Sequence, residues 1–215
     1  MHPVVTRNAA KKGDYMLWKF HVAPQIKDFE LHNNPVIVTV NKFNEESAQD
    51  FRTKVSLAHN TGQKVIPIVI DSYGGQVYSL MSMISTIKSS ELPIATIVQG
   101  KAMSCGALLF SFGEEGMRFV DKDATIMIHD VSSAQWGKVE ELRSSADESV
   151  RLNEKVYKMM ATNIGKPEDY FIKKIHEKGH ADWYVTPKEC KKINLANHIR
   201  VPKFNVDLSV DIKFV

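Results

Sequence analysis

Cysteine is scarce in this sequence, and long hydrophobic runs are missing. The two cysteines among 215 residues, Cys105 and Cys190, lie far apart and form no Cys-x-x-Cys pair. Neither a disulfide framework nor a cysteine-based zinc site is predicted, and a reducing compartment such as the cytoplasm fits best. The longest aliphatic run, Val65–Ile70, falls well short of the roughly 20 apolar residues that span a membrane. Since Met1–Ala10 also lacks an apolar stretch of secretory length, neither export nor membrane insertion is expected.

Charge of one sign is not concentrated anywhere along the chain. Lys and Arg number 28 against 25 Asp and Glu, and the two signs are mixed along most of the expected helices. A protein that binds nucleic acid usually carries a basic patch, so nucleic-acid binding is not expected. What is present is the composition of an ordinary folded domain, with 43% hydrophobic and 25% charged residues.

From Pro35 onward, short β-branched runs alternate with helical patterns. The runs are apolar on both faces, which predicts strands of a covered sheet at Val36–Val40, Val65–Ile70, Ile94–Val98 and Thr125–Ile128. Apolar residues at three- and four-residue spacing predict helices at Glu45–His59, Val77–Ser89 and Ser104–Phe112. This alternation predicts an α/β layered fold.

A much longer helix is predicted over Gly137–Asn163, about seven turns at 3.6 residues per turn. Its stripe consists of Val139, Leu142, Ala146, Val150, Asn153, Val156 and Met160. A helix that long is expected to project from the domain or to form an interface.

No repeat, low-complexity stretch or linker divides the chain, so we expect one domain over residues 35–200. Two less regular segments, 1–34 and 201–215, flank it. Within them, Tyr15–Val22 is a candidate edge strand, and the strict alternation of residues 206–215 predicts another strand.

Three segments contain residues with possible chemical roles. The first, Ile70 to Val77, is a strand that ends in Gly74-Gly75 and opens into a helix, which suits either an oxyanion hole or a simple turn. In the second, Ser104 begins an apolar helix as either its N-cap or a nucleophile. In the third, His129 ends a buried strand, where a lone histidine is more often structural than a base. A serine, a histidine and an aspartate at such ends would form a coherent catalytic set.

These segments together resemble the ClpP family of Clp protease proteolytic subunits. Gly74 to Val77 is similar to the family's Gly-Gly-Ser-Val, and Gly100 to Ala107 to its Gly-Gln-Ala-Ala-Ser-Met-Gly-Ala. Met127-Ile128-His129 is similar to its Met-Ile-His, and Asp182 to Cys190 to its Asp-x-Phe-Leu-Ser-Ala-x-Glu-Ala. Asn194 to Asn197 is similar to its closing Gly-Leu-Val-Asp. The resemblance spans about residues 35 to 199, with the motifs in the same order.

The resemblance implies a fold, an activity and a site. The fold would be the ClpP/crotonase-like α/β fold of repeated β-β-α and βαβ units, with a projecting handle helix. The activity would be that of a serine endopeptidase with Ser104, His129 and Asp182 as catalytic triad. The backbone N–H groups of Gly75 and Cys105 would form the oxyanion hole, and neither a cofactor nor a metal would be needed.

The resemblance also implies an assembly and a partner. Family members form two stacked heptameric rings, a tetradecamer that encloses the active sites and cleaves unfolded polypeptides. An ATP-dependent unfoldase of the ClpX, ClpA or ClpC type delivers the substrate. This sequence has no phosphate-binding Gly-x-x-x-x-Gly-Lys-Ser/Thr loop, so ATP would be handled by that separate partner.

Two departures from the family pattern stand out. Asp130 to Ala134 replaces the usual Gln-Pro and glycine-rich turn after the histidine. About four extra residues precede Asp182, near His176 to His180, which makes Glu177 an alternative to Asp182 as the orienting carboxylate.

Three other functions compete with that of a serine peptidase. His176-Glu177-Lys178-Gly179-His180 matches the His-Glu-x-x-His pattern of zinc peptidases, although Gly179 weakens the required helix and Thr186 stands where a third histidine would lie. A catalytically inactive ring subunit is a second alternative, and acyl-CoA chemistry, which related folds serve, is a third. The intact set of Ser104, His129 and Asp182 argues against an inactive ring subunit and against acyl-CoA chemistry.

Overall fold

The computed structural model describes residues 35–132 and 136–204. The chain divides into two units, residues 1–34 with 202–215 and Pro35–Val201. All helices and strands of the described residues lie in the second unit. The strands expected at Tyr15–Val22 and at residues 206–215 lie outside the described residues.

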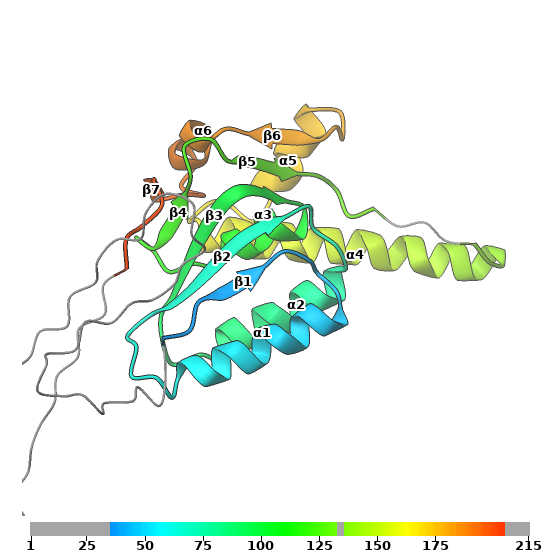
Figure 1. Ribbon diagram of the computed structural model, residues 1–215. Coiled ribbons are helices and arrows are strands. Elements are labelled where there is room, and N and C mark those ends of the chain that lie inside the picture. The colour runs from blue at the N-terminus through cyan, green and yellow to red at the C-terminus, as the bar shows by residue number, and fades with distance from the viewer. Residues whose placement is uncertain (1–34, 133–135, 205–215) are drawn as a thin grey trace, which may run out of the picture. The chain divides into compact units, whose positions relative to one another are not determined.

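A seven-stranded sheet forms the centre of this unit (Figure 1). Its main path runs in the order β1 (Val38–Val40), β2 (Ile66–Ser72), β3 (Ile94–Met103), β4 (Arg118–Val120) and β7 (His198–Ile199). Strand β3 is long enough to pair with β4 through its first half and with β5 (Thr125–Ile128) through its last three residues. Strand β6 (Trp183–Val185) pairs antiparallel with β5, and every other strand pair is parallel. The sheet therefore forks beside the end of β3.

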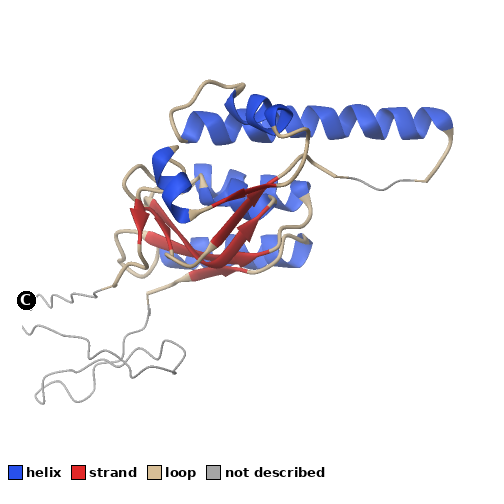
Figure 2. Ribbon diagram, turned by 90° about the horizontal axis from the view of Figure 1, so that it is seen from above, coloured by secondary structure: helices blue, strands red, loops and turns tan. Residues whose placement is uncertain are grey.

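Six helices accompany the sheet in the described residues. They are α1 (Glu45–Ala58), α2 (Val77–Lys88), α3 (Cys105–Phe110), α4 (Val139–Asn163), α5 (Tyr170–Glu177) and α6 (Pro187–Lys192). Helices α1 and α2 lie side by side, and α4 extends well beyond the sheet (Figures 1 and 2). The predicted α/β class and ClpP-like fold with a projecting helix are confirmed.

The predicted elements form because their apolar residues meet in one core. In α1, Ala48, Phe51, Val55 and Ala58 are buried at helical spacing, and Asn44 caps the helix by accepting a hydrogen bond from the Ser47 N–H. Strand β2 is buried at five consecutive residues from Ile66, as expected for a strand covered on both faces.

Helix α4 buries only its C-terminal half. Leu152, Val156 and Met160 are buried, whereas Val139, Leu142 and Val150 of the predicted stripe are exposed. The helix has 25 residues, roughly 37 Å at 1.5 Å per residue, so its first half reaches past the surface that it covers. The N-terminal half of the stripe is left without a partner in this unit.

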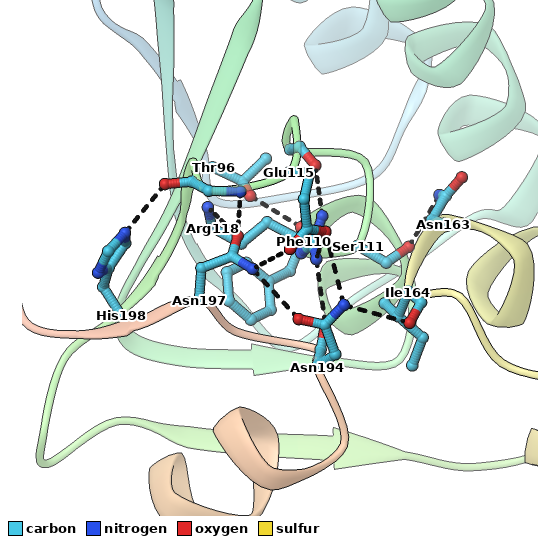
Figure 3. A network of polar contacts seen from close by, with 12 residues as sticks. Thr96, Phe110, Ser111, Glu115, Arg118, Asn163, Ile164, Asn194, Asn197 and His198 are labelled. Carbon is cyan, nitrogen blue, oxygen red and sulfur yellow. Dashed lines mark hydrogen bonds and ion pairs between the residues drawn. The ribbon is translucent and has the colours of Figure 1, made fainter.

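Strands β4 and β7 were not predicted, and for β4 a buried arginine explains why. Arg118 begins β4, and a charged residue in a three-residue strand breaks the apolar pattern. Its guanidinium is 1% exposed and donates to the carbonyls of Gly113 and Asn194 and to Glu115 (Figure 3). Asn197 accepts from the Arg118 N–H, which joins β7 to β4. The buried network thus ties the end of the unit to the sheet.

Candidate active site

Ser104 lies at the junction of β3 and α3, in a conformation that side-chain-bearing residues rarely adopt. Its φ is 53° and its ψ is −121°. Such a backbone costs about 1–3 kcal/mol and persists only where the surroundings enforce it. The hydroxyl makes no capping hydrogen bond with α3. Ser104 therefore has the position of an N-cap without its bonding, so Oγ is not held by the N–H groups that begin α3.

The Gly74-Gly75 turn lies directly against Ser104. A Cβ on Gly74 would come within 2.7 Å of the Ser104 Cβ, and one on Gly75 within 2.5 Å of the Phe43 carbonyl oxygen. Both glycines also have positive φ, 104° and 149°. Only glycine fits at either position, so the backbone of this turn can approach the serine closely.

Gly75 and Cys105 contact each other beside the serine. The Cys105 thiol donates to the Gly75 carbonyl at 3.2 Å, so these two residues are in contact across the turn. Cys105 is the first residue of α3, where the amide has no carbonyl partner within the helix. The arrangement suits stabilisation of a negatively charged oxygen on a group attached to Ser104. Burial raises the pKa of the Cys105 thiol to about 11, so it stays neutral and poorly nucleophilic near pH 7.

His129 follows the last residue of β5, the strand next to the end of β3. Met103 pairs with Met127, and the Ser104 N–H donates to the Met127 carbonyl at 2.9 Å. Because parallel strands end at the same edge of a sheet, Ser104 and His129 leave the sheet close together. In the part of the chain that the structure describes, the Ser104 hydroxyl and the His129 ring are not hydrogen-bonded to each other.

Asp182 precedes the first residue of β6 and faces His129. Ile128 pairs with Trp183 in the antiparallel ladder, which brings the next residues, His129 and Asp182, opposite each other. Their Nδ1 and Oδ1 atoms are 3.8 Å apart, too far for a hydrogen bond but within the range of an ion pair. Glu177, the alternative carboxylate, instead binds the Lys174 ammonium at 2.6 Å.

Asp130 is a neighbour of the site, and it begins the segment that departs from the family pattern, although it was not predicted as a site residue. Its carboxylate contacts the His180 Nδ1 at 2.7 Å and accepts a hydrogen bond from Asn153 at 2.9 Å. Burial alone would raise the pKa of Asp130, but the bonds from His180 and Asn153 outweigh it and hold this pKa below its ordinary value of 3.8. Two features of the sequence could have indicated this contact. Asp130 departs from the family motif, and Asn153 is a polar residue on an otherwise apolar stripe.

The zinc-peptidase pattern does not form the helix that it requires. Helix α5 ends at Glu177, and His180 adopts a left-handed φ of 61° beyond it. His180 turns its Nδ1 to Asp130. Across residues 35–132 and 136–204, no group of three or more His, Cys, Asp or Glu side chains is placed to hold a metal ion.

The fold and the strand-end serine define a ClpP-type protein. A family model described as Clp protease matches residues 25–203, most of the chain. The chain therefore belongs to the Clp protease family. Within the described residues, no helix is both long enough and apolar enough to cross a membrane.

Proposed function

We propose that this protein is a serine endopeptidase that cleaves unfolded polypeptides, with Ser104 as its nucleophile. The observation that carries the proposal is the state of Ser104 itself. The residue is held in a strained conformation, its hydroxyl does not cap α3, and His129 directly follows the neighbouring strand β5. A strained serine between a strand and a helix is the arrangement that exposes a nucleophilic hydroxyl.

The remaining residues take the roles that acyl transfer needs. His129 accepts the Ser104 proton as Oγ attacks the peptide carbonyl, then donates a proton to the leaving amine. Asp182 orients the imidazole and stabilises its charged form. The N–H groups of Gly75 and Cys105 bind the oxyanion of the tetrahedral intermediate. Water then hydrolyses the acyl-enzyme by the reverse sequence of proton transfers, so the chemistry uses neither a metal nor a cofactor.

His129 and Asp182 must come closer together before the site can catalyse the reaction. The separation of 3.8 Å between His129 and Asp182 has to shorten to a hydrogen bond if the carboxylate is to fix the imidazole. Helix α4 offers a cause for this shortening. Its C-terminal half contacts the segment after His129 through Asn153, while its N-terminal half projects with Val139 and Leu142 exposed. A contact on the projecting half would therefore be linked to the site.

The proposed assembly is two stacked heptameric rings joined through the projecting halves of α4. Enclosure of the site in such a chamber would restrict it to unfolded chains, which an ATP-dependent unfoldase of the ClpX, ClpA or ClpC type would deliver in the cytoplasm. The exposed apolar residues of α4 support this part of the proposal, because an apolar surface exposed on one chain often marks a contact with another.

The test is peptidase activity of the purified protein on an unstructured fluorogenic peptide, measured together with its assembly mass. Ser104→Ala should lower turnover on the order of 10⁴-fold, to near background, with no change in mass or melting temperature. Ser89→Ala is the control, since Ser89 is an exposed serine at the C-terminal end of α2, outside the site. An assembled wild type without activity would favour an inactive ring subunit, and activity that survives Ser104→Ala would exclude the proposed nucleophile.

A further inference from the structure

The backbone ladder that aligns the catalytic histidine and aspartate ends just before them. Ile128 and Trp183 form the last pair of the β5 and β6 strands, and His129 and Asp182 come next. No further strand pairing holds these two residues opposite each other. Something else must fix their separation if the site is to work.

Asp130 joins three segments immediately beyond that point. Its Oδ2 contacts the His180 Nδ1 at 2.7 Å, and its Oδ1 accepts from Asn153 at 2.9 Å and from the Tyr157 hydroxyl at 3.3 Å. Asn153 in turn accepts from the Val131 N–H at 3.0 Å. The segment after His129 is thus bound to α4 on one side and to the segment before Asp182 on the other.

The backbone at His180 is arranged to make this contact. Gly179 and His180 have left-handed φ values of 66° and 61°, and the His180 N–H donates back to the Ile175 carbonyl at the end of α5. A histidine in this conformation is uncommon, because a side chain there is disfavoured. The turn places the imidazole across from Asp130, which lies 50 positions earlier in the chain.

We propose that Asp130 and His180 form a clasp, a side-chain contact that sets the position of His129 relative to Asp182. The inference rests on the proposed serine peptidase function, since it concerns the same triad. The clasp lies one residue beyond His129 on one segment and two residues before Asp182 on the other. Breaking it frees the two segments to separate, because no strand pairing lies beyond Ile128 and Trp183.

Neither clasp residue is assigned a bond to the substrate, so the effect falls on turnover. A misplaced catalytic group lowers kcat through loss of geometry while leaving the binding of the substrate largely intact. The competing explanation is an ordinary surface ion pair, since the side chains of His180 and Asp130 are 59% and 31% exposed. Such pairs contribute little and would leave the kinetics unchanged.

The variants follow from the geometry of the contact. His180→Ala removes the imidazole. His180→Asn keeps a side-chain nitrogen at the same number of bonds from Cα, and asparagine tolerates the left-handed backbone conformation. Asp130→Asn removes the charge while keeping the shape. His176→Ala is the matched control, because the His176 ring lies 4.5 Å from that of His180 and its removal leaves the Asp130 contact in place.

The experiment measures kcat and KM on a fluorogenic peptide for the assembled protein. His180→Ala should lower kcat roughly ten- to hundredfold, with KM within about twofold of the wild type. His180→Asn should restore most of the loss, and His176→Ala should match the wild type. The double variant with Asp130→Asn should be no slower than the worse single variant, because both remove one interaction. Wild-type kcat in His180→Ala, or fully additive losses, would overturn the clasp.

Crystal structures of the wild type and of His180→Ala separate this inference from the proposed function. The distance from the His129 Nδ1 to the Asp182 Oδ1 should be longer in the variant. A longer distance combined with a wild type that cleaves no peptide would support the clasp and count against the peptidase. An unchanged distance together with an active wild type would refute the clasp alone.

Discussion

Two polar regions of this protein differ in how firmly their side chains are held. The Arg118 guanidinium is 1% exposed and binds the Gly113 carbonyl and Glu115 (Figure 3). At the candidate active site, His129 and Asp182 are 25% and 50% exposed and stand 3.8 Å apart. The Arg118 side chain is buried and hydrogen-bonded, whereas His129 and Asp182 are partly exposed and too far apart for a hydrogen bond. Substitutions should therefore reduce stability in the first region and activity in the second.

The glycine turn at the site offers the sharpest test of this difference. Gly75→Ala places a Cβ 2.5 Å from the Phe43 carbonyl oxygen and displaces a proposed oxyanion donor, so we expect kcat to fall about 10²-fold or more. Gly62→Ala is the control, because Gly62 also has positive φ but has no atom within 4 Å of the added Cβ. Both variants should lose some melting temperature. Equal kcat values for the two would remove Gly75 from the site.

The projecting half of α4 belongs to neither of these two regions, and a substitution there should change the assembly of the protein. Leu142→Glu would bury a charge in any contact between rings, which costs several kcal/mol, so the mass in solution should fall and activity should fall with it. Ser144→Glu adds the same charge two residues on, roughly opposite on the helix, and should leave the assembly intact. A fully active monomeric wild type would refute the assembly.

Arg118→Met should mainly reduce stability. The substitution keeps much of the aliphatic volume but leaves the Gly113 and Asn194 carbonyls without their donor, so we expect the free energy of unfolding to fall by about 2–4 kcal/mol. Arg143→Met, at an arginine that is largely exposed, should change it by less than about 0.5 kcal/mol. Urea unfolding measures both. If folded Arg118→Met lost kcat but not stability, the contrast between the two regions would be wrong.

The smallest expected effect is a dependence of stability on pH at the clasp. The pKa of Asp130 is lower in the folded protein than its ordinary value of 3.8, so its ionised form contributes stability above that pH. This contribution disappears as the pH falls through the lowered pKa. The difference in urea midpoint between the wild type and Asp130→Asn should therefore shrink as the pH falls from about 5 to below about 4. A difference that grew toward acid pH would contradict this sign.

Much of the fold was predictable from sequence because most elements carry a plain pattern. The β-branched runs became β1, β2, β3 and β5, and the helical spacings became α1 to α4. Strand β4 was missed because Arg118 begins it, and the exposed half of α4 could not be told from the buried half by spacing alone. Periodicity shows which face is apolar but not whether the same chain covers it.

Part of the candidate site was likewise predictable from the sequence, and part was not. Ser104, His129 and Asp182 were candidates because short motifs mark them, and the structure places them at three neighbouring strand ends. The contact between Asp130 and His180 could not be found so directly. It depends on the β5–β6 register and on a left-handed turn after α5, which no local pattern indicates.

The central claim is that the hydroxyl of Ser104 is a nucleophile. Reaction of the assembled protein with a fluorophosphonate, followed by proteolysis and mass spectrometry, locates the covalent adduct directly. We expect one adduct per chain on Ser104, formed much more slowly in His129→Ala and absent in Ser104→Ala. An assembled, folded protein that forms no adduct, or forms it on another residue, would show that Ser104 is not the nucleophile.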